Sequence, residues 1–235
     1  MSKGKISVGA ASTRSRPAKD ELARTAHLRR QQLELLALQA TRSPFAIFIA
    51  VGFVSYIAWG EVPLPLVVLW IGTLAAVLIS RMAYAVRLLR SEPADAQPAL
   101  NRMAWFAFAN GAVTGASMPL FFHALSDEGR TLLTMVLVCW SAGGVATAAA
   151  YARAFYAFVV PTLLPTAAVW AMTVPPQHAV LALLIVMFGV IEMFFVRDSE
   201  RVLRRSFSIR YDYERLLNAI DTAPKAAARD LGRSE

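Results

Sequence analysis

The sequence predicts an all-α integral membrane protein, in which a bundle of six transmembrane helices follows an amphipathic helix and precedes a cytoplasmic helix. Three observations predict this fold class. Of the 235 residues, 57% are hydrophobic and only 17% are charged, whereas soluble domains carry about 25% charged residues. The apolar residues fall in runs that are long enough to cross a bilayer, about 18 residues or more. The basic residues lie almost entirely on one side of those runs.

The region before the bundle has two predicted parts. Residues 1–19 are rich in Ser, Lys, Arg, Gly and Ala and have almost no large apolar side chain, which predicts disorder. Residues 20–43 have a helical pattern with one apolar face, which predicts an amphipathic helix on the membrane surface. This face consists of Leu22, Ala26, Leu33, Leu36 and Ala40. The long basic start, with no cleavage site after the first apolar run, excludes a secretory signal.

The transmembrane domain is predicted at residues 44–197. Pro, Gly and charged residues punctuate the apolar runs and divide them into separate helices. The least obvious division lies at Arg153, the one charge between Leu132 and Val174, and it separates the fourth span from the fifth. The spans are expected at about 44–60, 64–88, 101–123, 131–150, 154–174 and 178–197.

The distribution of Lys and Arg predicts the topology. With the N-terminus placed inside, 23 of the 24 basic residues lie in cytoplasmic segments or their flanks, and only Arg130 lies outside. This asymmetry follows the positive-inside rule and predicts a multi-pass protein of the bacterial inner membrane with both termini in the cytoplasm. The net charge of +8 then faces anionic lipid headgroups and needs no nucleic-acid partner.

The helical pattern continues beyond the last span. Val202, Ile209 and Leu216 recur every seven residues, so residues 198–221 are predicted to form a coiled-coil-like cytoplasmic helix that pairs two copies of the chain. Residues 222–235 are rich in Ala, Lys, Arg, Asp and Gly and are expected to form a linker.

No motif for catalysis, nucleotide binding or zinc binding is present, so the sequence predicts no enzyme, cofactor or metal. His123 and His178 lie at outer span ends, on the side of Glu61, Asp127 and Glu128. Because these residues belong to different loops and have no diagnostic spacing, we interpret them as interfacial side chains rather than metal ligands.

Two charged residues lie within predicted spans. Arg81 lies in the second span and Glu192 in the sixth, at similar distances from the cytoplasmic surface. Charges at this depth are costly unless they pair, reach the interface or face water. The sequence therefore indicates either an Arg81–Glu192 ion pair or separate snorkelling of each side chain toward the cytoplasm.

Small residues mark candidate helix contacts. Ala107, Gly111 and Gly115 repeat every four residues in the third span, and Gly143 and Gly144 are adjacent in the fourth. Such faces allow close approach of helix backbones, so we interpret them as helix-packing sites.

Two further features of the spans have alternative interpretations. Asn110, Trp105 and Trp140 are candidates for lining a small-molecule pocket instead of packing against neighbours. Pro161 and Pro165 predict a bend in the fifth span, which is a candidate hinge.

Several segments together resemble a known family. They are Glu34-Leu35-Leu36 through Arg42-Ser43-Pro44, the pair Gly143-Gly144, and the run from Ala148 to Phe158 followed by Pro161 and Pro165. In this order and spacing they resemble the six-helix N-terminal membrane sensor region of bacterial hybrid histidine kinases and GGDEF/EAL cyclic-di-GMP enzymes. The resemblance covers roughly residues 33–217. It implies a helix leading from the last span into a PAS, kinase or GGDEF domain, and residues 231–235 resemble the lead-in to a PAS domain. The chain itself has no such domain, so the resemblance implies either a fragment of a longer sensor or a stand-alone relative.

The function that these features predict is that of a sensory and anchoring module for two-component or cyclic-di-GMP signalling. Its expected partners are the lipid bilayer, a second copy of the chain and an unidentified small ligand. A small multi-pass transporter and a purely structural membrane anchor are the alternatives. A transporter is disfavoured because the sequence has no inverted repeat and no acidic residue at mid-depth of a span. The sequence hardly distinguishes an anchor from a sensor.

Overall fold

The structure is a computed structural model that describes residues 15–42, 44–91, 95–173 and 177–231. Within these ranges all regular secondary structure is helical, which confirms the predicted all-α class. The helices are α2 (Ser15–Arg42), α3 (Pro44–Ile57), α4 (Leu64–Arg90), α5 (Ala96–Phe121), α6 (Asp127–Ala148), α7 (Ala152–Met172) and α8 (Gln177–Leu231). The prediction of disorder for residues 1–14 and of a linker at 232–235 falls outside the described residues.

The chain divides into two compact units. The larger unit is Gln32–Arg201, which contains α3 to α7 and the adjoining parts of α2 and α8. The smaller unit comprises the described parts of Met1–Gln31 and Val202–Glu235. Within it, the guanidinium of Arg24 donates a hydrogen bond to Ser208 Oγ and joins its two helical segments.

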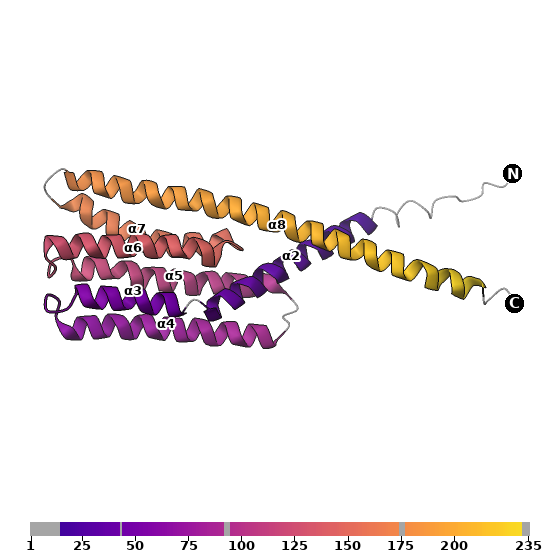
Figure 1. Cartoon of the computed structure of the whole chain (residues 1–235), viewed down its shortest axis with the longest axis horizontal. Coiled ribbons are helices and arrows are strands. Elements are labelled where there is room, and N and C mark those ends of the chain that lie inside the picture. The colour runs from indigo at the N-terminus through magenta and orange to yellow at the C-terminus, as the bar shows by residue number, and fades with distance from the viewer. Residues whose placement is uncertain (1–14, 43, 92–94, 174–176, 232–235) are drawn as a thin grey trace, which may run out of the picture. The chain divides into compact units, whose positions relative to one another are not determined.

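The larger unit is an antiparallel bundle. Figure 1 shows α3, α4, α5, α6, α7 and the first part of α8 side by side, with the C-terminal ends of α3, α5 and α7 at the same end of the bundle. Short connections enforce this order, because helices joined by few residues run antiparallel. The turn after α3 contains Gly60 at φ 80°, a left-handed conformation that favours glycine.

Four helical segments are long and apolar enough to cross a membrane, which indicates a membrane protein. They are Leu64–Arg90, Asp127–Ala146, Ala152–Met172 and His178–Arg210. The other two predicted spans correspond to α3 and α5. The 14 residues of α3 reach about 21 Å, less than the roughly 30 Å of a hydrocarbon core, and α5 carries Asn, Thr, Ser and Gly among its apolar residues. The number of six spans therefore stays a prediction.

The outer surface of the bundle is apolar. Large hydrophobic side chains are exposed along α4 and the first part of α8, among them Leu69, Ile79, Leu184 and Phe194. A soluble monomer rarely exposes so continuous an apolar surface, whereas a lipid-facing helix requires one. This surface is compatible with direct contact between the bundle and a bilayer.

The helix α2 differs from its prediction in two ways. It begins at Ser15, so residues 15–19, predicted to be disordered, belong to the helix. The part of its predicted apolar face that belongs to the larger unit is also covered by protein: Leu33, Leu36 and Ala40 are at most 4% exposed. Ala26, nearer the start of the helix, is exposed, and the side chain of Leu22 lies outside the described part. The physical reason is that the bundle offers this apolar stripe a protein surface to pack against, so the stripe does not need lipid.

The helix α8 also extends further than expected. It continues through the predicted linker to Leu231, because Ala, Lys and Arg favour helix. Along the heptad positions, the side chains of Val202 and Ile209 are 69% and 62% exposed, while the side chain of Leu216 lies outside the described part.

Candidate functional site

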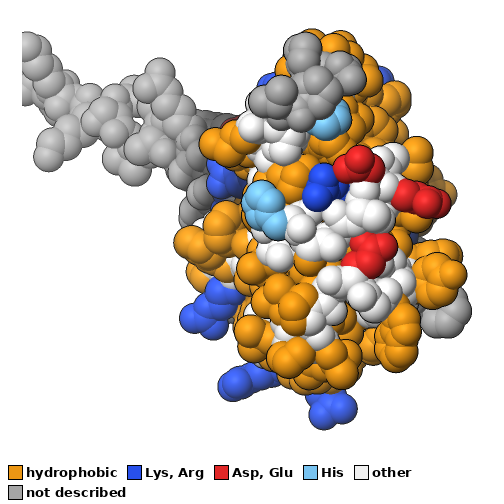
Figure 2. Space-filling model, turned by 90° about the vertical axis from the view of Figure 1, so that its left-hand side faces the viewer, with side chains coloured by type: hydrophobic (Ala, Val, Ile, Leu, Met, Phe, Trp, Pro, Cys, Tyr) orange, Lys and Arg blue, Asp and Glu red, His pale blue; other side chains and the backbone are white. Residues whose placement is uncertain are grey.

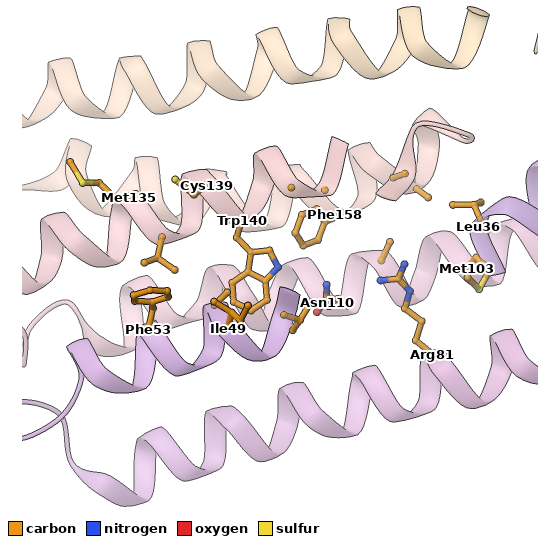
Figure 3. Close-up of a pocket in the computed structure, with 18 residues that line it drawn as sticks. Leu36, Ile49, Phe53, Arg81, Met103, Asn110, Met135, Cys139, Trp140 and Phe158 are labelled. Atoms are coloured by element: carbon orange, nitrogen blue, oxygen red, sulfur yellow. The ribbon is translucent and has the colours of Figure 1, made fainter. Parts of the chain in front are cut away.

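A cavity of about 440 Å³ lies within the larger unit. Residues of α2 to α7 line it, and Figure 3 shows the side chains that enter it from the surrounding helices. The lining is mainly apolar, with Phe53 from α3, Met103 from α5, Trp140 from α6 and Phe158 from α7. The volume falls within the range of about 300–1,000 Å³ that is typical of small-molecule sites.

Two polar side chains point into this apolar space. Figure 3 shows Arg81 extending into the cavity from α4 and Asn110 from α5. Asn110 is 3% exposed and its Oδ1 has no hydrogen-bond partner in the described structure, and the buried Nε of Arg81 likewise has none there. Buried polar groups are normally hydrogen-bonded, so two unpartnered groups in one cavity mark it as a candidate binding site.

The cavity opens toward the outer surface of the bundle. Its lining includes Ile49, Phe53 and Met135, which are 48%, 58% and 59% exposed, and the exposed Cys139. Each of these side chains is apolar or weakly polar, so the opening lies on the surface that is compatible with lipid contact.

Small residues on α6 leave room for the cavity. A Cβ added to Gly143 would meet no atom within 4 Å, and this exposed glycine lines the cavity. A Cβ on Gly144, in contrast, would approach Phe158 Cε1 to 2.8 Å. Of the two glycines predicted to mediate helix packing, Gly144 therefore contacts α7, and Gly143 borders open space instead.

The predicted small-residue face of α5 lies against α7. A Cβ on Gly111 would collide with the backbone oxygen of Phe158, and one on Gly115 would collide with that of Pro161. Thr162 Oγ1 donates to Phe158 O at 2.7 Å and lies 3.3 Å from Gly111 O, so a hydroxyl also bridges the two helices. Ala107, the third member of this face, is buried and lines the cavity.

Both candidate hinge prolines lie inside α7, which is helical throughout Ala152–Met172. Proline has no N–H, so the carbonyl groups of Ala157 and Pro161 lose their helical donors. Pro161 O is the atom against which Gly115 packs, so Pro161 lies at a close contact between α5 and α7.

The candidate ion pair between Arg81 and Glu192 is not formed. Glu192 is 4% exposed, and its Oε1 accepts a hydrogen bond from Ser141 Oγ at 3.2 Å. Among the described residues no ion pair joins it to Arg81, which points into the cavity instead. The sequence could place both residues at similar depth, but it could not show that they face different neighbours.

Only two of the three residues proposed to line a pocket do so in the structure. Asn110 and Trp140 line the cavity, whereas Trp105 is 70% exposed and packs edge-on against Phe108 at 5.6 Å between ring centroids. Trp105 lies on the outer surface of α5 because the helical repeat turns it away from the Ala107 and Gly111 face.

Acidic side chains gather at the end of the bundle where α3, α5 and α7 finish, inside a rim of hydrophobic side chains (Figure 2). Glu61 accepts hydrogen bonds from the backbone N–H and the hydroxyl of Ser126, at 2.5 and 3.0 Å. Arg130 pairs with Asp127 at 2.9 Å and covers the ring of Phe122. These groups tie two turns together and satisfy one another.

The histidines at this end contribute aromatic contacts. His178 stacks edge-on against Trp170 at 4.9 Å between ring centroids, and His123 against Phe122 at 5.8 Å. Within the described ranges no group of three or more His, Cys, Asp or Glu residues is arranged to hold a metal ion.

One polar cluster was missed by the sequence analysis. Gln32 Nε2 donates to Ala150 O at 2.7 Å and to Glu200 Oε1 at 3.2 Å, and Glu200 Oε2 lies 3.4 Å from the backbone nitrogen of Ala152. This cluster joins α2, the turn between α6 and α7, and α8. The signal that could have revealed it is Gln32 itself, a polar residue four positions before Leu36 on the apolar face of α2.

Comparisons with known proteins give no relative: no family model, no curated protein and no solved structure matches the chain.

Proposed function

We propose that the chain is a membrane-embedded sensory and anchoring module of a bacterial signal-transduction protein. It crosses the inner membrane six times with both ends in the cytoplasm, carries no catalytic site, and acts on an output domain through α8. The observation that carries the proposal is the length of α8, which has 55 residues and so extends about 80 Å. A helix that only crosses a bilayer needs about 30 Å, so most of this length is available to transmit a change away from the membrane.

The change of composition along α8 supports this role. From Val180 to Phe195 its exposed side chains are large and apolar, as contact with lipid requires. From Arg197 onward, charged residues alternate with exposed apolar residues such as Val202 and Ile209. An exposed apolar seam at seven-residue spacing on a charged helix favours pairing with a second copy of the chain.

The cluster of Gln32, Glu200 and the backbone of Ala150 and Ala152 supplies a route for coupling. It connects the turn between α6 and α7 to α8 just beyond the apolar segment. A ligand that shifts α6 or α7 would therefore alter the hydrogen bonds that position α8. In this proposal the cluster is the element whose two arrangements are biased by both the ligand and the output.

Labelling with a membrane-impermeant maleimide tests the topology. In a Cys139→Ser background, single cysteines replace Glu128 at the acidic end and Ser91 and Arg153 at the opposite end. In intact cells we expect Glu128→Cys to react with the reagent, and the other two only after the cells are permeabilised. Labelling of Arg153→Cys in intact cells would contradict six spans with cytoplasmic ends.

Cysteine crosslinking in membranes tests the pairing of α8. We expect Val202→Cys, Ile209→Cys and Leu216→Cys, each in the Cys139→Ser background, to form disulfide-linked dimers on oxidation. Arg204→Cys, two residues from the seam position 202, is the matched control and is expected to crosslink weakly. Equal crosslinking at all four positions, or none at any, would contradict a dimer formed along this seam.

A further inference from the structure

We propose that the cavity binds a single-chain anionic amphiphile of the fatty-acid type, with its oxyanion head held by Arg81 and Asn110. The proposal deepens the proposed function, because it names the ligand class, and the ligand's role as the sensed signal rests on that function. Binding itself does not require any output and is measured on its own.

The head of the ligand is inferred from an uncompensated charge. Arg81 points into an apolar cavity, and no Asp or Glu is among the described residues that line it. A partly buried cation whose Nε has no partner is costly in a membrane, whereas a carboxylate can accept two parallel hydrogen bonds from a guanidinium. Asn110 lies on the next helix, and because its unpartnered Oδ1 can only accept, its amide Nδ2 is the atom that would donate to the head.

The depth of Arg81 favours a compact head. Arg81 precedes the end of α4 at Arg90 by nine residues, which places its Cα about 13 Å inside the helix end. The bulky headgroup of a membrane phospholipid belongs at the interface, whereas a carboxylate or a simple phosphate ester can enter to this depth along the cavity.

The tail of the ligand is inferred from the shape and lining of the cavity. In Figure 3, Phe53 and Met135 lie at one end of the cavity, Arg81 and Met103 lie toward the other, and Trp140 lies between. An acyl chain directed away from Arg81 would therefore contact only apolar surface. Because the rim is exposed and apolar, the chain can enter sideways from the bilayer without crossing water.

Cys139 provides a direct probe, since it is the single cysteine of the chain, is exposed and lines the cavity. The purified full chain in phosphatidylcholine nanodiscs is treated with N-ethylmaleimide, and the rate of alkylation is followed by mass spectrometry. We expect oleate to slow alkylation at concentrations where methyl oleate, which keeps the chain but lacks the charge, has no effect. Equal protection by oleate and methyl oleate, or protection by neither oleate nor oleoyl phosphate, overturns the proposal.

Two variants test the head and the tail separately. Arg81→Gln is expected to weaken protection by oleate at least about tenfold, the equivalent of about 1.4 kcal/mol, while the exposed Arg87→Gln on the same helix retains it. Gly143→Leu is expected to fill the cavity and abolish protection, while Gly72→Leu, equally free of neighbouring atoms but outside the cavity, retains it. If oleate protects Cys139 equally well in both Arg81→Gln and Gly143→Leu, the proposed ligand site is wrong. If one of the two variants is unstable, the other still tests the site.

Two further experiments identify the headgroup of the ligand and distinguish ligand binding from the proposed sensory function. Preferential protection by oleate over oleoyl phosphate assigns a carboxylate head, and the reverse assigns a phosphate. Oleate is then added during the crosslinking of Ile209→Cys in the Cys139→Ser background. A change in crosslinking on addition of oleate supports sensing through α8. If oleate protects Cys139 in the alkylation experiment but does not change the crosslinking, the ligand site is supported and the sensory function is contradicted.

Discussion

Small residues have opposite roles in two regions of the bundle, the contact between α5 and α7 and the side of α6 that faces the cavity. Along the contact of α5 with α7, Gly111 and Gly115 have no room for even a Cβ atom, because backbone atoms of the partner helix occupy that space. On the side that faces the cavity, Gly143 could accept a Cβ without meeting any atom within 4 Å. The first group brings two helices together, and the second leaves a space between helices.

The difference explains how one bundle can be closely packed in one place and open in another. Close approach of α5 and α7 gains dispersion contacts and an interhelical hydroxyl bond, which are the terms that stabilise helix pairs in lipid. An open space forfeits such contacts, so the cavity lowers stability unless a ligand fills it. We therefore expect substitutions on the α5–α7 contact to change stability, and substitutions in the cavity to change binding.

The largest expected effect comes from overpacking the α5–α7 contact. Gly115→Val would drive methyl groups into the backbone of Pro161 and Thr162, and we expect a loss of about 1–3 kcal/mol in the free energy of unfolding. Thermal unfolding in nanodiscs or mild detergent measures it. Gly52→Val, at an exposed glycine of α3 with no neighbouring atom, is the matched control, and equal losses in both would remove the contrast between the two sides.

A smaller effect is expected at the buried Glu192. Its hydrogen bond with Ser141 predicts that Ser141→Ala and Glu192→Met, which removes the acceptor at similar size, couple in a double-mutant cycle by about 0.6–1.7 kcal/mol. The Arg81→Gln and Glu192→Gln pair is expected to be additive, since Arg81 points into the cavity. Rescue of the single changes by exchanging the two charges, Arg81→Glu with Glu192→Arg, would restore the ion-pair interpretation.

The smallest effect is expected at the hydroxyl that bridges the helices. Thr162→Val keeps the shape of the side chain but removes the hydrogen bonds to Phe158 O and Gly111 O, and we expect a loss of about 0.6 kcal/mol. Thr73→Val is the control, because the exposed Thr73 donates only to Leu69 O within its own helix. A greater loss at Thr73 than at Thr162 would show that the interhelical bond contributes nothing.

The sequence alone was sufficient for the helical class and for the four helical segments that are long and apolar enough to cross a membrane. Both depend on composition over a window of about 20 residues, which does not require knowledge of neighbours. The sequence also predicted a break between the fourth and fifth spans near Arg153, and the structure has its turn just before that residue, between the end of α6 at Ala148 and the start of α7 at Ala152. The close-packing role expected of Gly111 and Gly115 was predictable as well, since small residues four positions apart share one helix face.

Only the tertiary structure decided which residue each polar side chain meets. Arg81 and Glu192 have similar depths in the sequence, but the rotation of α4 and α8 in the bundle turns one into a cavity and the other toward Ser141. Gly143 and Gly144 are chemically identical, but successive residues of a helix are rotated by about 100°. Gly143 therefore borders open space, while Gly144 contacts Phe158. Periodicity assigns residues to a face of a helix, whereas the neighbour of that face is set by packing across the whole bundle.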